Sequence, residues 1–512
     1  MMKKIPEFLL KQKTLIMILL FCLFTAIMQG NSYLFYQTSH AAKSMIMALV
    51  IFGYFVLLYI CYIKKLLNEE NKIFFIILAG VILRSFYVIF TGVNDRQHDE
   101  GAFSSLYDTS VNAGHLGYIE YLCKFKHLPD FSPYEMFSYY HPPVHHILSA
   151  LFIGLNIILG VGEELAFENV QVLTLFYSSV CIMISYGIFK KLHFQQTGIC
   201  LATALIAFHP GMIFMSGSVN NDMLATTLTF ACFYFAITWI REKTLVNLIK
   251  IALSLGFGMI TKLNVAVMAF PLAVVFLLYF IDQVKAKSTL KCIRDYAIFL
   301  VITAGIGLSW VIRNLIFYRT NPGVPVLTEE SILYIGRFSL WDIFGIPTNF
   351  LMEYPFHTIN GTQICNAWLI LFRTSIFAEV RPADLSDFLM ALCQIALVLA
   401  MVFGILYAVT TIVMQIKEIK RGNKELGIFL LSGYIAVVLT FIAFIIKYPY
   451  TCSCDFRYVV ISILFTAITI CQLNVTGKES GKFAKNIAFF FNGGILFLLS
   501  LTTMILLFWN QW

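Results

Sequence analysis

Long apolar stretches separated by short polar ones fill most of the chain. Each stretch is close to the roughly 20 residues with which a helix crosses about 30 Å of hydrocarbon. None of them alternates apolar and polar positions, as the roughly 10-residue strands of a membrane β-barrel do. The pattern predicts an all-α polytopic membrane protein. The candidate helical segments are 15–35, 44–63, 73–91, 143–161, 168–189, 198–216, 222–240, 246–261, 264–281, 295–317, 388–414, 426–446, 457–473 and 486–508.

The composition agrees with this class. Hydrophobic residues make up 59% of the 512 residues and charged residues only 12%, against about 25% charged residues in a soluble domain. The net charge of +8 does not indicate a nucleic-acid partner, because the basic residues gather between apolar segments, as in Lys285–Arg294 and Lys417–Lys424. Cytoplasmic loops of membrane proteins have this bias. Membrane lipid is therefore the expected surrounding, and no nucleic acid is expected.

Charge also predicts the topology. No small-residue cleavage site follows the apolar part of "MMKKIPEFLLKQKTLIMILLFCLF", which predicts an uncleaved first helix and a cytoplasmic N-terminus. If every candidate segment crossed the membrane, five later basic stretches would lie outside. All five return to the cytoplasm if 143–161 is a re-entrant or interfacial helix, which leaves about 13 transmembrane helices. These stretches are Lys190–Lys191, Arg241–Lys243, Lys285–Arg294, Lys417–Lys424 and Lys478–Lys485.

Two long segments are then external, and they divide the chain. Phe103, Leu106, Tyr107 and Val111 share one helical face, which predicts a surface helix in the first external loop. We see no internal repeat of the kind from which many transporters are built. The predicted units are an N-terminal transmembrane hairpin (1–72), a transmembrane core that includes the first external loop 92–142 (73–317), a large external loop or lid (318–387) and C-terminal transmembrane helices (388–512).

Most cysteines lie inside apolar segments, where they act as small hydrophobic residues. Cys123, Cys365, Cys452 and Cys454 are predicted to lie outside the membrane, where disulfides can form. The sequence leaves their pairing open.

The predicted topology brings ionisable residues together at the outer ends of helices. The acids are Asp99 and Glu100 in "GVNDRQHDEGAF" and Asp222 in "SVNNDML"; the cations are Lys262, Arg313 and Arg457. Ionisable groups at membrane depth are costly and are usually paired or functional. Cations beside carboxylates at this level suggest an anionic ligand, and a phosphate at the depth of the lipid headgroups fits.

Simpler roles remain open for each of these residues. Asp222 can cap its helix, because Asp is favoured at a helix N-terminus. Arg313 and Arg457 can extend to lipid headgroups. Lys262 can serve only as a polar residue in a short turn, and Asp99 with Glu100 can face solvent in a loop.

Histidines are concentrated in the first external loop and the segment after it. His141 and His145 would share a helical face, as would Asp95, His98 and Asp99, which permits a metal site of the His/carboxylate type. No HExxH or CxxC spacing supports a metal, so none is predicted, although a divalent metal stays open. Alternatively, "YYHPPVHH" begins a helix with Pro142–Pro143 in its first turn.

At these residues the sequence resembles the GT-C-type membrane glycosyltransferases that use lipid-phosphate donors, relatives of the protein O-mannosyltransferases and aminoarabinose transferases. The similar motifs occur in the family's order over about residues 73–473. Two helices precede the first external loop here, where many relatives have one, and His145–His146 stand where aromatic residues or leucines are common. The motifs are "HDEGAFSSLYDTSVNAGHL", "HPPVHHILSALF", "HPGMIFMSGSVNNDMLATTLTF", "GMITKLNVAVMAFPLAVVF", "WVIRN…NPGVPV" and "DFRYVVISILF".

The resemblance implies a GT-C-like fold and a sugar donor on a polyprenyl phosphate. Asp99 matches the family's catalytic base, with Glu100 beside it. Asp222 would orient donor or acceptor, and Lys262, Arg313 and Arg457 would stabilise the departing phosphate. Asn221 and His141, in the same motifs, are assigned to substrate binding. A monophosphate leaving group needs no metal, whereas a diphosphate donor would favour one.

The predicted function is transfer of a sugar, with inversion, to a lipid, protein or cell-envelope glycan at the external face of a prokaryotic plasma (inner) membrane. The alternative is a transporter or flippase of a lipid-linked or anionic substrate. Ionisable residues at helix ends rather than at mid-bilayer weigh against that alternative. A third hypothesis is a metal-dependent membrane hydrolase that uses the histidines.

Overall fold

The fold is a bundle of α-helices joined by short turns. A computed structural model describes residues 7–31, 40–93, 114–320, 322–323, 329–331, 333–347, 355–356, 365–379, 385–476, 493–496, 498–503 and 505–506. The named helices are α1 (Glu7–Gly30), α2 (His40–Ile63), α3 (Glu69–Phe90), α4 (Gly114–Phe125), α5 (Val144–Ile158), α6 (Glu163–Glu168), α7 (Gln171–Lys191), α8 (Gln196–Phe208), α9 (Pro210–Phe214), α10 (Asp222–Arg241), α11 (Leu245–Met259), η3 (Leu263–Met268), α12 (Ala269–Lys285), α13 (Thr289–Gly307), α14 (Ser309–Tyr318), α15 (Leu340–Phe344), α16 (Ala367–Phe377), α17 (Asp387–Lys420), α18 (Lys424–Lys447), η4 (Thr451–Cys454), η5 (Phe456–Tyr458) and α19 (Ser462–Thr476).

The predicted class, an all-helical membrane protein, is confirmed. Within the described residues, 8 helical spans are long and apolar enough to cross a membrane, or up to 9 if α13 and α14, bent by 53°, count as one. Six shorter apolar helices accompany them, α5 among them. The number of about 13 crossings stays a prediction. The predicted surface helix with Phe103 and Val111 lies outside the described residues.

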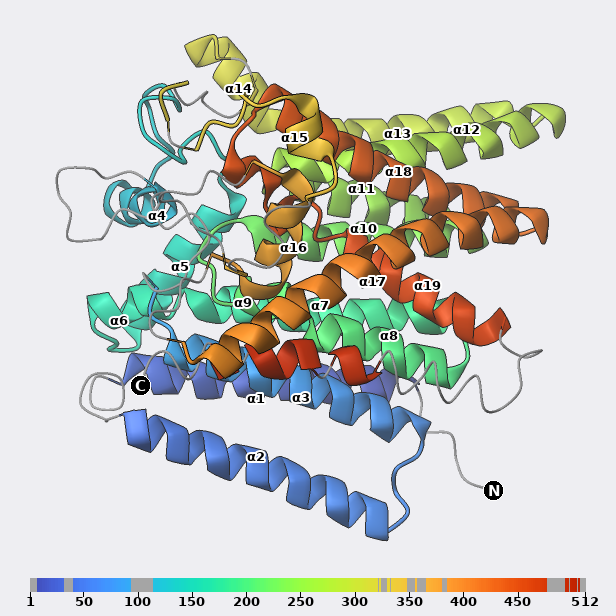
Figure 1. Cartoon of the computed structure of the whole chain (residues 1–512). Helices are drawn as coiled ribbons and strands as arrows, with labels where there is room; N and C mark the ends of the chain where they lie inside the picture. The colour runs from blue at the N-terminus through green and yellow to red at the C-terminus, as the bar shows by residue number, and fades with distance from the viewer. Residues whose placement is uncertain are drawn as a thin grey trace.

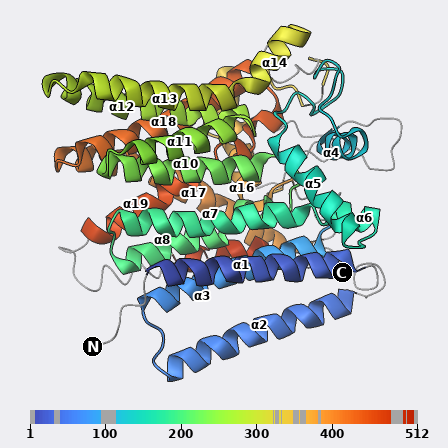
Figure 2. The same ribbon diagram turned by 180° about the vertical axis from the view of Figure 1, so that it is seen from behind.

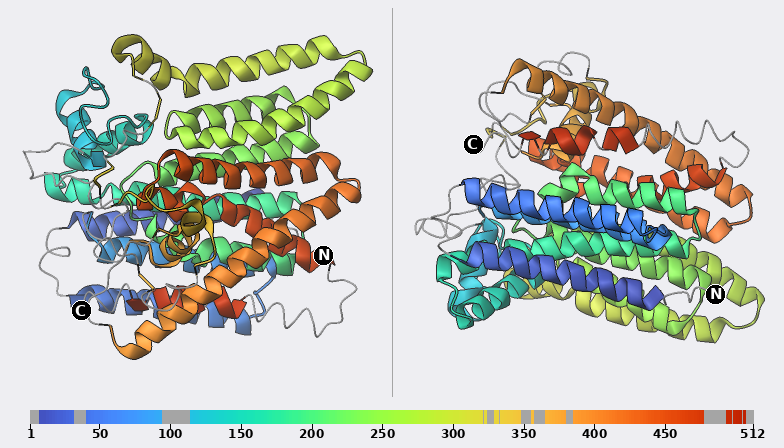
Figure 3. Two further views of the ribbon diagram at one scale, coloured as in Figure 1. Left: turned by 45° about the horizontal axis from the view of Figure 1, so that its top comes forward. Right: turned by 90° about the horizontal axis from the view of Figure 1, so that it is seen from below.

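The long helices run side by side, so the bundle has two ends (Figures 1 and 3). Ion pairs and a hydrogen bond join several polar turns at one of them, which we call the basic end. Lys190 on α7 lies 3.5 Å from Glu70 on α3, and Lys191 lies 3.6 Å from Glu242 after α10. Lys243 pairs with Glu425 on α18. Turns that the positive-inside pattern assigned to one side of the membrane therefore do share one end.

Helices α4, α5 and α6 lie together at the opposite end, seen on the left in Figure 1 and on the right in Figure 2. Helix α5 is inclined to the long helices there. Its 15 residues span about 22 Å at 1.5 Å per residue, less than the roughly 30 Å of a bilayer core. The inclination and length agree with a helix that does not cross.

The sequence predicts one continuous helix over 198–216, but the structure breaks it into α8 and α9 at His209–Pro210. Pro210 has no N–H, and the change of direction removes the next donor, so the carbonyls of Ile206 and Ala207 lose their helical partners. The buried guanidinium of Arg84 on α3 replaces them. It donates to Ala207 O at 2.5 Å and to Ile206 O at 3.0 Å. It also donates to Ser178 Oγ on α7 at 2.8 Å, so one side chain joins three helices.

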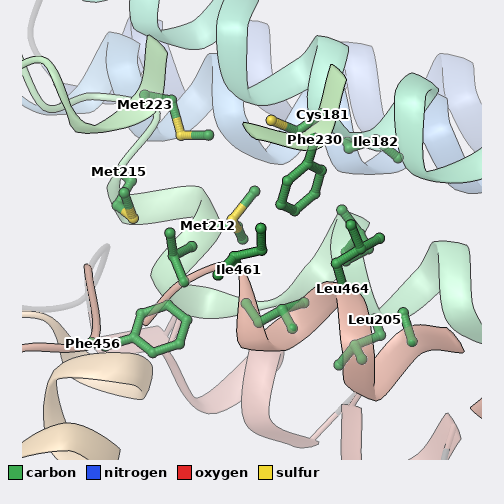
Figure 4. Packing of buried hydrophobic residues seen from close by; sticks show 14 of the residues in the cluster. Cys181, Ile182, Leu205, Met212, Met215, Met223, Phe230, Phe456, Ile461 and Leu464 are labelled. Atoms are coloured by element: carbon green, nitrogen blue, oxygen red, sulfur yellow. The ribbon is translucent and has the colours of Figure 1, made fainter. Parts of the chain in front are cut away.

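Behind this break lies the apolar core (Figure 4). Met212 of α9 and Phe230 of α10 are completely buried, and Leu464 of α19 packs in the same cluster. At Gly211 a Cβ atom would come within 2.7 Å of the ring of Phe456, so only glycine allows α9 and η5 to approach this closely. The helix break at His209–Pro210 therefore positions α9 so that it contacts η5, the turn that carries Arg457.

All twelve cysteines lie in described residues, and every one is free. Cys365 and Cys454 are buried, and Cys123 and Cys452 are partly buried. The disulfides that the sequence left open are therefore not formed in this structure.

Arg84→Met should destabilise the protein by about 2 kcal/mol or more, because two buried carbonyls lose their donors. Thermal unfolding in detergent micelles, followed by circular dichroism, measures the loss. Arg421→Met is the matched control, since Arg421 makes an exposed pair with Glu418, and such pairs contribute about 0–1 kcal/mol. Equal effects of the two substitutions would contradict the role given to Arg84.

Candidate functional site

Two predicted site residues, Asp99 and Glu100, lie outside the described residues, so their roles stay predictions. The other six are described. The structure brings Asp222, Lys262 and Arg457 into one ion cluster, with Asn221 and His141 beside it. Arg313 makes its described contacts elsewhere.

The centre of the site is the carboxylate of Asp222, which is 4% exposed. The ammonium of Lys262 pairs with its Oδ1. Nη1 of Arg457 lies 3.9 Å from its Oδ2. Both cations also lie over the ring of Tyr458, at 5.0 Å for Lys262 and 5.1 Å for Arg457. The carboxylate of Asp222 thus faces two cations, and these three charges sum to one positive charge.

Helix ends position these three side chains at the end opposite the basic turns. Asp222 is the first residue of α10, and the residue that flanks the helix is Asn221. The carboxylate of Asp222 is therefore an ion-pair partner rather than a cap. Asn221 donates through Nδ2 to Thr261 O at 2.7 Å, which ties the start of α10 to the turn that presents Lys262. Asn221 and Thr261 are fully buried, so this turn is held rigidly.

The third partner comes from a short 3-10 turn in front of α19. Asp455 accepts from the backbone N–H of Arg457 at 2.8 Å through Oδ1 and so starts η5. The N–H of Phe456 donates to Oγ1 of Thr374 on α16 at 2.9 Å. Ile335 donates its N–H to Pro449 O at 2.8 Å. Described parts of the predicted external loop 318–387 therefore pack on the segment that carries Arg457.

Arg313 lies on α14, and its guanidinium donates to Pro129 O and to Asn314 Oδ1. The same group is 4.8 Å from the ring of Trp310. Nε1 of Trp310 donates to Tyr140 O at 3.2 Å. These contacts connect α14 to the loop before α5, and none of them reaches Asp222.

Beside the ion cluster, four histidines pack against one another. Nδ1 of His115 on α4 lies 2.9 Å from Nε2 of His146 on α5. The ring of His141 stacks on that of His115 with centroids 5.0 Å apart. His145 bonds to Val219 O at 2.7 Å through Nε2. Val219 stands three residues before Asp222, so the histidines lie against the loop that leads to it.

Burial and neighbouring charge keep these imidazoles neutral. Desolvation lowers the pKa of His115 well below its usual value, and the neighbouring histidines and the charges of Lys262 and Arg457 lower it further. Desolvation also lowers the pKa of His141, followed by the charge of Lys262, His146 and Arg457. The two cations thus reach the histidines electrostatically.

An apolar cavity of about 720 Å³ lies next to the segment that carries Arg457, because Phe456 and Val459, which flank Arg457 and Tyr458, both line it. The rest of the wall comes from α8, α9, α15 and the residues after it, α16, α17, α18, α19 and Ile495, Leu496 and Leu499. A polar cluster beside an apolar cavity suits a ligand with an anionic head and a hydrocarbon tail.

No group of three or more His, Cys, Asp or Glu side chains in the described part of the chain could hold a metal ion. The sequence predicts that His141 and His145 share a helical face. In the structure His141 precedes α5 and only His145 lies within the helix.

Residues 140–310, about a third of the chain, match the family model of the dolichyl-phosphate-mannose-protein mannosyltransferases. The match includes His141, Asn221, Asp222 and Lys262. The resemblance to the lipid-phosphate-dependent membrane glycosyltransferases is confirmed. Over this part of its length the chain is similar to membrane glycosyltransferases. No curated protein matches its sequence.

Two crystal structures of the Archaeoglobus fulgidus oligosaccharyltransferase are similar to it. The apo form has 14% identity over 88% of this chain and 56% of that one, with a TM-score of 0.42. The complex with zinc and sulfate has 12% identity, over 85% and 52%, with a TM-score of 0.41. This chain spans about half the length of those structures. The likeness is too distant to carry an argument.

Sequence reasoning missed Tyr458, Thr374 and the partners of His141. Tyr458 stands next to Arg457 in "DFRYVV", so an aromatic ring beside a site cation was the available signal. Thr374 and His115 come from other parts of the chain, and no local pattern connects them to Arg457 or His141.

Asp222→Asn should destabilise the protein by about 3–5 kcal/mol, because two buried cations lose their carboxylate. Lys262→Met in the same chain should restore part of that loss, since it removes one of the two cations. A double-mutant cycle of unfolding free energies in detergent measures the coupling. Glu69→Gln, in an exposed pair with Lys72, is the control. Strictly additive effects of Asp222→Asn and Lys262→Met would contradict the ion cluster.

Acid should destabilise the histidine cluster. Because the pKa values of His115 and His141 are lowered in the folded protein, the unfolded chain binds more protons below its ordinary value of 6.5. Stability is therefore complete above pH 6.5 and falls as the pH drops below it, by on the order of 1 kcal/mol per pH unit for each imidazole. Unfolding temperatures from pH 7.5 to 5.5 measure the slope. His141→Gln should reduce it and the exposed His127→Gln should not; identical slopes would refute the assignment.

Proposed function

We propose that this protein transfers a sugar from a polyprenyl-phosphate donor to an acceptor at the external face of the membrane. The observation that carries the proposal is the buried Asp222–Lys262–Arg457 cluster, whose Arg457 follows a residue that lines an apolar cavity, Phe456. The family match over residues 140–310 supports the same class of reaction.

The donor phosphate would bind to Lys262 and Arg457. The charges of Lys262, Arg457 and Asp222 sum to one positive charge, and a phosphodiester carries one negative charge. When the bond from the anomeric carbon to the phosphate oxygen breaks, a second negative charge develops on the phosphate. Two fixed cations in a buried site stabilise that charge without reorganising, which is often the largest contribution to catalysis.

The polyprenyl chain would occupy the cavity of about 720 Å³. Phe456 and Val459 line the cavity while Arg457, between them in sequence, faces Asp222. A lipid phosphate bound to Arg457 therefore has its tail directed to apolar side chains. Burial of each CH₂ of the tail contributes about 0.8 kcal/mol, so the cavity would supply much of the donor affinity.

The acceptor would attack the anomeric carbon from the side opposite the phosphate, with inversion. Asp99 would take the proton of the acceptor as general base, and Glu100 would orient the acceptor or the sugar. Asn221, His141 and Arg313 would complete the binding site. A monophosphate leaving group is neutralised by these side chains, so the proposal includes no metal; a diphosphate donor would favour a divalent metal.

We place the reaction at the plasma membrane of a prokaryote, with the N-terminus in the cytoplasm. The basic end of the bundle would face the cytoplasm, in accordance with the bias of basic residues toward that side. The acceptor would be a lipid, a protein or a cell-envelope glycan, and it would enter from outside past the segment 318–387.

Asp99→Asn should lower the rate of sugar transfer by about 10²–10⁴-fold, because the general base is lost. Transfer from radiolabelled polyprenyl-phosphate mannose to acceptors in membranes that contain the protein measures it, and other polyprenyl-phosphate sugars follow if mannose is inert. Asp95→Asn, four residues away, is the control and should retain transfer. Gel filtration checks that both variants are folded. If Asp99→Asn then transfers sugar at the wild-type rate, Asp99 is not the general base and the proposed mechanism is wrong.

A further inference from the structure

The histidine cluster lies beside the ion cluster, and the transfer reaction described above gives a role only to His141. His115 and His146 are hydrogen-bonded with ring planes 2° apart, and His141 stacks on His115. His115 and His146 are almost completely buried. Hydrogen-bonded imidazoles in close contact can hold one added proton jointly, since the proton on one ring is stabilised by the lone pair of the next.

Three elements hold the cluster against the site. His115 comes from α4 and His146 from α5, while His141 stands in the loop before α5. Val219 packs in the same apolar cluster as Leu116 of α4, next to His115. A change of charge at Asp222 and its partners therefore reaches the histidines across buried, apolar side chains, where electrostatic interactions are weakly screened.

Among the described residues, Lys262 and Arg457 act on both His115 and His141, and Asp222 acts on His145. Tyr118 stacks on His146 at 4.4 Å, and Tyr140 lies 4.4 Å from His141. Lys262 and Arg457 contribute a positive potential at the imidazoles. A phosphate dianion bound to both cations would offset that contribution.

We propose that the protein binds a lipid monophosphate, the product of the transfer, together with one proton, which the cluster of His115, His141 and His146 takes up from solvent. An N–H bond forms on an imidazole nitrogen, and no other bond changes. The inference rests on the proposed function. It gives the cluster the task of holding the dianionic product at low pH and releasing it at higher pH. The donor, a monoanionic diester, takes up less of a proton.

Titration calorimetry tests this on the purified full chain in detergent, with farnesyl monophosphate as the ligand and farnesol as the blank. The same titration at pH 7.5 in two buffers of different ionisation enthalpy yields the number of protons taken up. We expect up to about one proton per phosphate bound by the wild-type protein. His146→Gln, which removes the hydrogen-bond partner of His115, should reduce the uptake while the lipid phosphate still binds. His127→Gln, an exposed histidine of the same loop, should leave it unchanged.

The outcomes distinguish a failure of the proton-uptake proposal from a failure of the proposed function. Binding of farnesyl monophosphate without proton uptake by the wild-type protein would overturn the inference and leave the proposed phosphate site intact. Uptake that is equal in wild type, His146→Gln and His115→Gln would overturn it as well. If farnesyl monophosphate does not bind at all, the proposed function fails instead. The decisive wild-type measurement needs no variant, so misfolding of His115→Gln cannot obscure it.

Discussion

The placement of one carboxylate against two cations, all three largely buried, is the constraint on which the site depends. Asp222, Lys262 and Arg457 come from three separate elements, and each would be costly to bury alone. The start of α10, the turn before η3 and the turn η5 must therefore lie close enough for these side chains to meet. Two cations around one carboxylate also suit an anionic ligand.

A second constraint, a helix break at Pro210, allows Arg457 to reach Asp222. Pro210 interrupts the helix that the apolar pattern would otherwise continue, and Arg84 supplies the donors that the broken turn lacks. The short helix α9 can then approach η5 closely at Gly211, against the ring of Phe456. Arg457 follows Phe456 directly, so a helix break and a glycine decide where this cation stands.

The cavity and the histidine cluster differ in polarity. Apolar side chains from α8, α9 and α15 to α19 form much of the cavity wall, while imidazoles and phenols pack together at α4 and α5. This difference suits an amphipathic ligand, because apolar side chains stabilise its tail and the imidazoles can share protons. Described parts of 318–387 also pack on the segment before α19, where Thr374 contacts Phe456 and Ile335 contacts Pro449.

The sequence by itself determined the class of the protein, because a run of about 20 apolar residues has few structures open to it in a bilayer. Charge bias also placed the turns around Lys190, Lys243 and Glu425 at one end, since it acts over whole loops. The motifs indicated Asp222, Lys262 and Arg457 as site residues, and their spacing could not say that they form one cluster. That decision needed the tertiary structure, as did the break at Pro210, the assignment of Arg313 to Pro129 and the pairing of His115 with His146. Each of these depends on contacts between residues far apart in the chain, where distance in sequence carries no information on distance in space.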